Sequence, residues 1–156
     1  MRRAIAFAGA ALLLAAAPAH AQQSALPELQ LNVGMYVVQA EVADQEPTRM
    51  EGLMRRRSMP QNHGMLFVFD RPDKYCMWMK NTLIPLSVAF LNEAGTIINI
   101  ADMRPQTEDA HCSAGTARYA LEMNRGWFAQ RGIGAGVRLR GLHGPHGPHG
   151  PHARSP

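Results

Sequence analysis

Leu86-Ser-Val-Ala-Phe-Leu-Asn-Glu-Ala-Gly-Thr-Ile-Ile-Asn-Ile-Ala-Asp-Met103 is the most strongly patterned stretch of this 156-residue sequence. It contains two apolar runs, residues 86–91 and 96–103, and the segment Asn92-Glu-Ala-Gly95 joins them. Two apolar runs joined by a short, turn-rich link are typical of a β-hairpin. The middle of the chain is therefore predicted to form antiparallel β-structure.

Segments of the same kind lie on both sides of this hairpin. Strands are predicted over residues 35–42, 64–69, 75–79, 119–123 and 137–142. Met50, Leu53 and Met54 recur at helical spacing and predict a short helix over 46–57. One or two helical turns are expected over 124–131, ended by Gly132. The pattern indicates a β-rich α+β fold: one small domain with a barrel-like sheet and two short helices.

The first 21 residues have the features of a secretory signal peptide. Arg2 and Arg3 precede an uncharged apolar run over 4–17, and Ala19-His-Ala21 provides a small-x-small cleavage site. The run is shorter than the roughly 20 residues that span a bilayer. We therefore expect export to the periplasm or the medium, and no membrane attachment after cleavage.

The rest of the chain divides into three parts. Residues 22–32 are polar and poorly patterned, which predicts a flexible leader, and residues 33–142 form the predicted globular domain. A tail over 143–156 repeats His-Gly-Pro, a composition that cannot form a packed core. Imidazoles at this spacing predict weak binding of divalent zinc, nickel or copper; they belong to His143, His146, His149 and His152.

Charge and cysteine content limit the partners and the compartment. Lys and Arg total 16 against 12 Asp and Glu, and the only basic cluster is Arg55-Arg-Arg57, so a nucleic-acid partner is not expected. We expect a monomer. Cys76 and Cys112 are the only cysteines, and an even number in an exported chain favours a disulfide. Metal thiolates or a reactive thiol are the alternatives.

Several motifs resemble one family along nearly the whole domain, from Val33 to Leu142. They are Glu51-Gly-Leu-Met-Arg55, Gly64-Met-Leu-Phe-Val-Phe69, Trp78-Met-Lys-Asn-Thr-Leu-Ile-Pro-Leu86 and Leu121-Glu-Met-Asn-Arg-Gly-Trp127. They closely resemble the domain of unknown function 192 family. The resemblance implies a compact β-rich fold that is often exported, and it implies no reaction. Ser87 stands where members usually have Asp, so a site that needs this carboxylate is in doubt.

A polar cluster within these motifs is the first candidate binding site. Lys80, Asn81 and Thr82 place a cation, an amide and a hydroxyl at a strand end, and Arg55 and Glu122 are polar residues in neighbouring motifs. Together they predict a site for a small polar ligand such as a carboxylate, a phosphate or a sugar. The alternative is structural: Asn81 and Thr82 make turn bonds, and Lys80 pairs with Glu122 or another acid.

Methionines suggest a second kind of site. The chain has ten Met, and Met77 and Met79 would share one strand face, where soft thioethers could bind copper(I). The alternative is that they fill an irregular core. Because no catalytic motif is present, we expect a non-catalytic binding or accessory module, with metal handling as the alternative; an enzymatic activity is left open.

Overall fold

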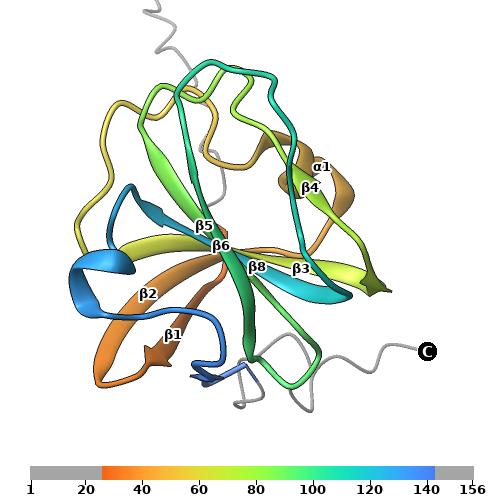
Figure 1. The fold of residues 1–156 in the computed structure, drawn as a ribbon. Helices are drawn as coiled ribbons and strands as arrows, with labels where there is room; N and C mark the ends of the chain where they lie inside the picture. Colours follow the sequence, from red (N-terminus) through yellow and green to blue (C-terminus); the bar gives the residue numbers. More distant parts are fainter. Residues whose placement is uncertain (1–25, 143–156) are drawn as a thin grey trace, which may run out of the picture.

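A computed structural model describes residues 26–142. Most of this segment forms one seven-stranded sheet in the order β6-β5-β8-β3-β2-β1-β9 (Figure 1). All neighbouring strands are antiparallel except β2 and β3, which are parallel and flank the connection through the helix α1. A separate two-stranded ribbon pairs β4 with β7. The elements are β1 (Glu28–Val33), β2 (Tyr36–Ala43), α1 (Glu46–Glu51), β3 (His63–Asp73), β4 (Cys76–Met77), β5 (Leu86–Leu91), β6 (Ile97–Met103), β7 (His111–Cys112), β8 (Ala117–Asn124), the 3-10 turn η1 (Ala129–Arg131) and β9 (Leu139–Arg140).

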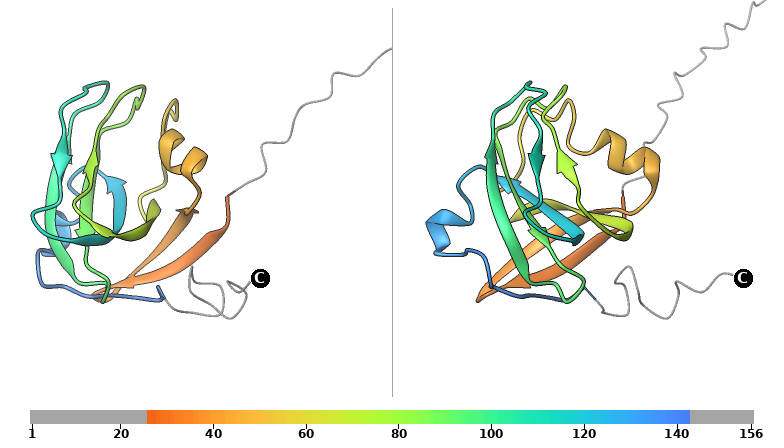
Figure 2. Two further views of the ribbon diagram at one scale, coloured as in Figure 1. Left: turned by 90° about the vertical axis from the view of Figure 1, so that its right-hand side faces the viewer. Right: turned by 45° about the vertical axis from the view of Figure 1, so that its right-hand side comes forward.

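The sheet curls into a half-barrel whose two edges meet at one end (Figure 2). A β-bridge joins Thr96, just before β6, to Arg138, just before β9. The Leu139 N–H also donates to the Gly95 carbonyl at 2.8 Å. The predicted hairpin is confirmed as β5–β6, and its turn therefore also holds the sheet closed.

Alternating side chains give the sheet two apolar faces. All seven strands contribute side chains to one face, which we call the inner face. It carries the larger hydrophobic cluster, the inner cluster, which includes Leu31, Leu66 and Leu121. The opposite or outer face carries Met65, Phe67 and Val88. Helix α1, the β4–β7 ribbon and the loops beside them cover this outer face (Figure 1). Two buried layers explain why β3 and β5 read as almost continuous apolar runs.

The prediction of a β-rich fold is confirmed, whereas the prediction of two short helices is wrong. The helix expected over 46–57 ends at Glu51, because Gly52 has a φ of +51° and leaves the helical conformation. The helical turns expected over 124–131 are reduced to the three residues of η1. Helical spacing of apolar residues therefore predicted one real helix and overestimated its length.

Two boundaries also differ from the prediction. Residues 28–32, expected within a flexible leader, belong to β1, where Leu29, Leu31 and Val33 point into the inner cluster. The intervening Glu28, Gln30 and Asn32 made this alternation look polar. The strand expected over 75–79 is confined to Cys76–Met77. The predicted signal peptide and the His-rich tail lie outside the described residues.

Candidate functional site

A cavity of about 320 Å³ lies on the outer face of the sheet, between α1 and β4. One wall is the stretch from Arg49 to Met54, and the other is the stretch from Tyr75 to Trp78. The floor comes from β3 and β8, through Phe67, Phe69 and Glu122, and Thr82 completes the lining. Aromatic rings, thioethers and aliphatic groups make most of this surface, as in many small-molecule sites.

Glu122 is the buried polar residue of the cavity floor. Its β-ladder partners on the same face are Met65 on β3 and Val88 on β5, so apolar side chains flank it on both sides. The residue is 4% exposed, and no hydrogen bond or ion pair to its carboxyl group is found within residues 26–142. Burial away from water raises the pKa of Glu122 from 4.5 to about 8. At neutral pH this pKa favours the protonated form of the carboxyl group.

The α1 wall is fixed to the sheet by one arginine and one glycine. The Arg49 guanidinium donates to the carbonyls of Asp44 and Val68 and pairs with Asp70 at 3.0 Å. A Cβ on Gly52 would lie 3.2 Å from the Phe67 ring, so a glycine lets the turn after α1 approach the cavity floor. These contacts set the distance between the wall and the floor.

The β4 wall is held by a disulfide and by a ring stack. Cys76 and Cys112 face each other across the β4–β7 ribbon, with Cα atoms 3.9 Å apart, and form the predicted disulfide. The Tyr75 ring stacks on Phe69, with ring centres 3.6 Å apart and planes at 10°. The wall is therefore attached covalently to β7 and by packing to β3.

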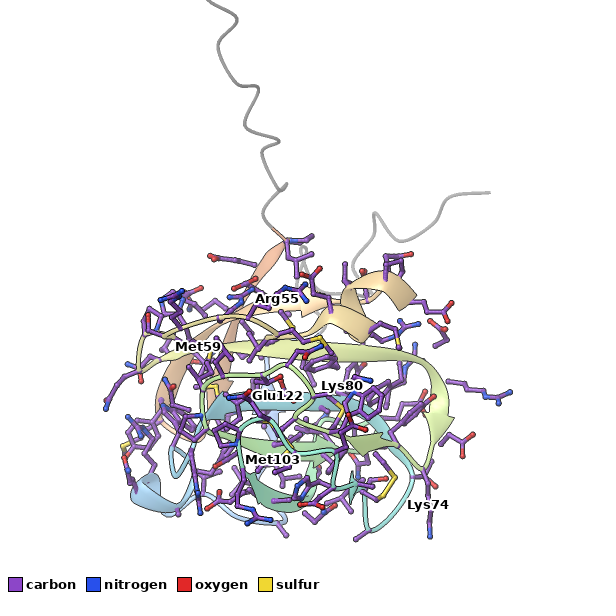
Figure 3. All side chains as sticks on the ribbon, turned by 90° about the horizontal axis from the view of Figure 1, so that it is seen from above. Arg55, Met59, Lys74, Lys80, Met103 and Glu122 are labelled. Atoms are coloured by element: carbon purple, nitrogen blue, oxygen red, sulfur yellow. A yellow bond between two sulfur atoms is a disulfide. The ribbon has the colours of Figure 1, made fainter. Side chains whose placement is uncertain are left out.

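The structure brings two of the five predicted ligand residues into the cavity. Thr82 and Glu122 line it, whereas Arg55, Lys80 and Asn81 do not. Figure 3, which looks down on the loops, shows Glu122 near the middle of the molecule. The polar ligand residues predicted from the sequence are thus divided between the cavity and its surroundings.

The other three residues make contacts of their own beside the cavity. Lys80 pairs with Glu108 at 3.8 Å and lies 5.3 Å from the centre of the Trp78 ring, so Glu122 is not its partner. Asn81 has a φ of +56°, and its carbonyl accepts from the Arg55 N–H at 2.8 Å. The Arg55 side chain pairs with Glu51 in an exposed i, i+4 ion pair. Lys80, Asn81 and Arg55 thus contribute to the loops beside the cavity. One side-chain turn bond of the kind expected as the structural alternative is present, from the Thr82 hydroxyl to the Lys80 carbonyl at 3.3 Å.

Methionines meet at the cavity in a different combination from the one predicted. Met77 lines it, but Met79 is fully buried in the outer cluster. Met50 and Met54 line it from the opposite wall. Within residues 26–142 no group of three or more His, Cys, Asp or Glu side chains could hold a metal ion. The candidate ligands His143, His146, His149 and His152 lie outside this range.

Most of the cavity lining carries no recognisable signal in the sequence. The sequence pattern predicts Phe67 and Phe69 as part of a buried strand, and Met50 and Met54 as apolar positions of a helix. The one available signal was Glu122, an acidic residue inside the apolar run 119–123. A carboxyl group at such a position is rarely buried without a partner.

Ser87 lies on the opposite face of the sheet from the cavity. It is the ladder partner of Met123, which belongs to the inner cluster, whereas Glu122 faces outward. The Ser87 hydroxyl donates to Asp102 at 2.5 Å and accepts from the Gly126 N–H at 2.8 Å. The Asp-to-Ser departure therefore leaves the cavity lining intact.

Within residues 26–142, no helix is long and apolar enough to cross a membrane.

Two solved structures resemble this one over most of its length. A Sinorhizobium meliloti 1021 protein described as a "putative transcription regulator" is 35% identical, with a TM-score of 0.69 over 74% of this chain and 92% of its own. A protein of unknown function from Novosphingobium aromaticivorans DSM 12444 is 34% identical, with a TM-score of 0.73 over 81% of this chain and 94% of its own.

A search of curated proteins found no significant match. The DUF192 family model, described as "Uncharacterized ACR", matches residues 29–141. This range contains the nine β-strands of the described segment, α1 and the described residues that line the cavity, except that β1 begins at residue 28. The chain therefore belongs to the DUF192 family, whose activity is uncharacterised.

Proposed function

We propose that this protein is an exported small-molecule binding module and that its ligand occupies the cavity above Glu122. The observation that carries the proposal is a carboxyl group that is 4% exposed, has no partner among residues 26–142 and lies at the base of an otherwise mostly apolar cavity. Buried polar groups are nearly always hydrogen-bonded, and exceptions concentrate at functional sites. A ligand that pairs with Glu122 would remove this cost.

The dimensions of the cavity are consistent with this function. Its volume of about 320 Å³ lies at the lower end of the range typical of ligand pockets. Both walls are anchored, one by Arg49 and the other by the Cys76–Cys112 disulfide. An anchored cavity loses little conformational freedom on binding, which favours affinity.

Methionine methyl groups offer a direct test. With 13C-labelled Met methyls in the full chain, a fragment screen should produce ligands that shift the signals of Met50, Met54 and Met77. Met35 is exposed and absent from the lining, so its signal serves as an internal control. Hits should lose affinity in Glu122→Gln. Fragments that shift all methyl signals equally, or none, would contradict a site in this cavity.

Export is the second part of the proposal. The sequence of residues 1–21 supports it, and so does the disulfide, since disulfides persist in oxidising compartments. Expression of the full chain in a Gram-negative host should yield a periplasmic product that begins at Gln22. Retention of the intact amino terminus in the cytoplasm would refute this part.

Metal handling is retained as the second candidate because three thioethers line one cavity. Met50 and Met54 come from one wall and Met77 from the other, and His111 is the ladder partner of Met77. Copper(I) titration of a chain that ends at Leu142 separates a cavity site from the His-rich tail. One equivalent bound by this shortened chain, and lost in Met77→Leu, would favour copper. Binding that disappears with the tail would leave only the predicted weak tail site.

A further inference from the structure

The chemistry of the cavity lining indicates the class of ligand. We infer that the cavity binds a small organic cation: a protonated amine on a compact apolar body, with the ammonium group on the Glu122 carboxylate and the apolar body against the aromatic residues. This inference rests on the proposed function and specifies its ligand.

The first support is the aromatic content of the lining. Phe67, Phe69, Tyr75 and Trp78 all contribute surface to the cavity. Aromatic π faces attract cations, and a desolvated contact can contribute about 2 kcal/mol. The Trp78 ring already attracts one cation, the Lys80 ammonium, at 5.3 Å from its centre. An alkyl or aryl amine would match both the rings and the thioethers beside them.

The second support is the charge balance. Among residues 26–142, Arg49 is the single basic residue in the lining, and its guanidinium is already bonded to two backbone carbonyls and to Asp70. Two carboxyl groups line the cavity, Glu51 and Glu122, and only Glu51 has a cationic partner within the described part of the chain, Arg55. The Tyr75 hydroxyl could also donate a hydrogen bond to a ligand, but it already donates to the Arg71 carbonyl. An anionic ligand would thus meet carboxyl groups and an occupied arginine, whereas a cation would meet a carboxyl group without a partner.

Proton balance gives the inference a signature. At neutral pH the unliganded Glu122 holds a proton, because burial raises its pKa to about 8. An ammonium ligand pairs with the carboxylate, so binding releases that proton to the buffer. No redox partner or covalent step is needed. By linkage, the affinity should rise about tenfold per pH unit between pH 6 and 8 and level off above that range.

Three probes with one shared body test the inference on the full chain: phenethylamine, phenethyl alcohol and phenylacetate. Calorimetry in buffers of different ionisation enthalpy measures affinity and proton release, and Met methyl shifts locate the site. We expect the amine to bind at least tenfold more tightly than the other two, with close to one proton released at pH 6.5. Glu122→Gln should weaken it by about 10- to 100-fold, the effect of losing a charged hydrogen bond.

The control is Glu93→Gln, an exposed glutamate of the β5–β6 turn that does not line the cavity and should change the affinity less than threefold. If the alcohol or phenylacetate binds in the cavity as tightly as the amine, or if amine binding does not depend on Glu122, the inference is overturned and the proposed function stands. If no fragment of any charge shifts the cavity methyls, both fail.

Discussion

At the scale of the residue, Glu122 is the feature that separates this domain from a simple β-scaffold. Alternation along β8 directs its side chain to the outer face, between Met65 and Val88. A leucine at this position would bury without cost, whereas a carboxyl group must either stay protonated or find a cationic partner. The geometry thus links one residue to both the stability of the protein and its candidate function.

Stability should therefore depend on pH through Glu122. Its pKa is raised in the folded state, so the folded protein binds more protons than the unfolded chain between pH 4.5 and 8. The free energy of unfolding should fall across this window, by on the order of a few kcal/mol, and Glu122→Gln should remove that fall. Urea unfolding at a series of pH values measures it. An equal slope in wild type and Glu122→Gln would show that Glu122 is not the cause.

At the scale of the element, the cavity depends on how α1 is fastened to β3. The Arg49 side chain, 16% exposed, donates to two backbone carbonyls, whereas the Arg55 side chain is exposed and makes one ion pair. Arg49→Ala should lower the free energy of unfolding by about 1–3 kcal/mol, since buried acceptors lose charged donors. Arg55→Ala should cost under about 1 kcal/mol. Similar losses in chemical denaturation would contradict the anchoring role of Arg49.

The β4–β7 ribbon is the other wall, and its disulfide links residues 36 positions apart. In the chain-entropy model a loop of this length contributes roughly 3–4 kcal/mol. Replacing both Cys76 and Cys112 by Ser should lower stability by about that amount and weaken fragment binding in the cavity. A double variant that is destabilised but binds fragments with unchanged affinity would show that the ribbon does not shape the site.

At the scale of the whole molecule, the closure of the half-barrel depends on the turn that follows β9. Gly141 has a φ of +98°, and a Cβ there would lie 2.7 Å from the Gln30 carbonyl of β1. Gly34 also has a positive φ, of +62°, but a Cβ built on Gly34 would meet no atom within 4 Å. Both changes to Ala carry a conformational cost of about 1–2 kcal/mol, and Gly141→Ala should cost at least about 1 kcal/mol more because of the clash. Thermal unfolding compares them, and equal losses would argue against tight closure at β9.

Features that lie within one short segment could be predicted from the sequence, whereas features that join distant segments could not. The β5–β6 hairpin, the buried strand at 64–69 and the disulfide follow from patterns within short segments. Helix α1 was predicted too long because Gly52, whose conformation ends it, looks tolerable within a helical pattern. The cavity could not be predicted, because its lining comes from α1, β3, β4, β8 and three connecting segments that only the folded chain brings together.

The titration of Glu122 shows whether its carboxyl group is buried without a partner. The side-chain carboxyl 13C signal, assigned by comparison with Glu122→Gln and followed from pH 3 to 10, reports the protonation of this group alone. We expect a midpoint near 8 without ligand, shifted to lower pH by a bound amine. A titration midpoint near pH 4.5 that no amine changes would mean that the carboxylate is already solvated or paired. That result would contradict a cavity that binds a cationic ligand.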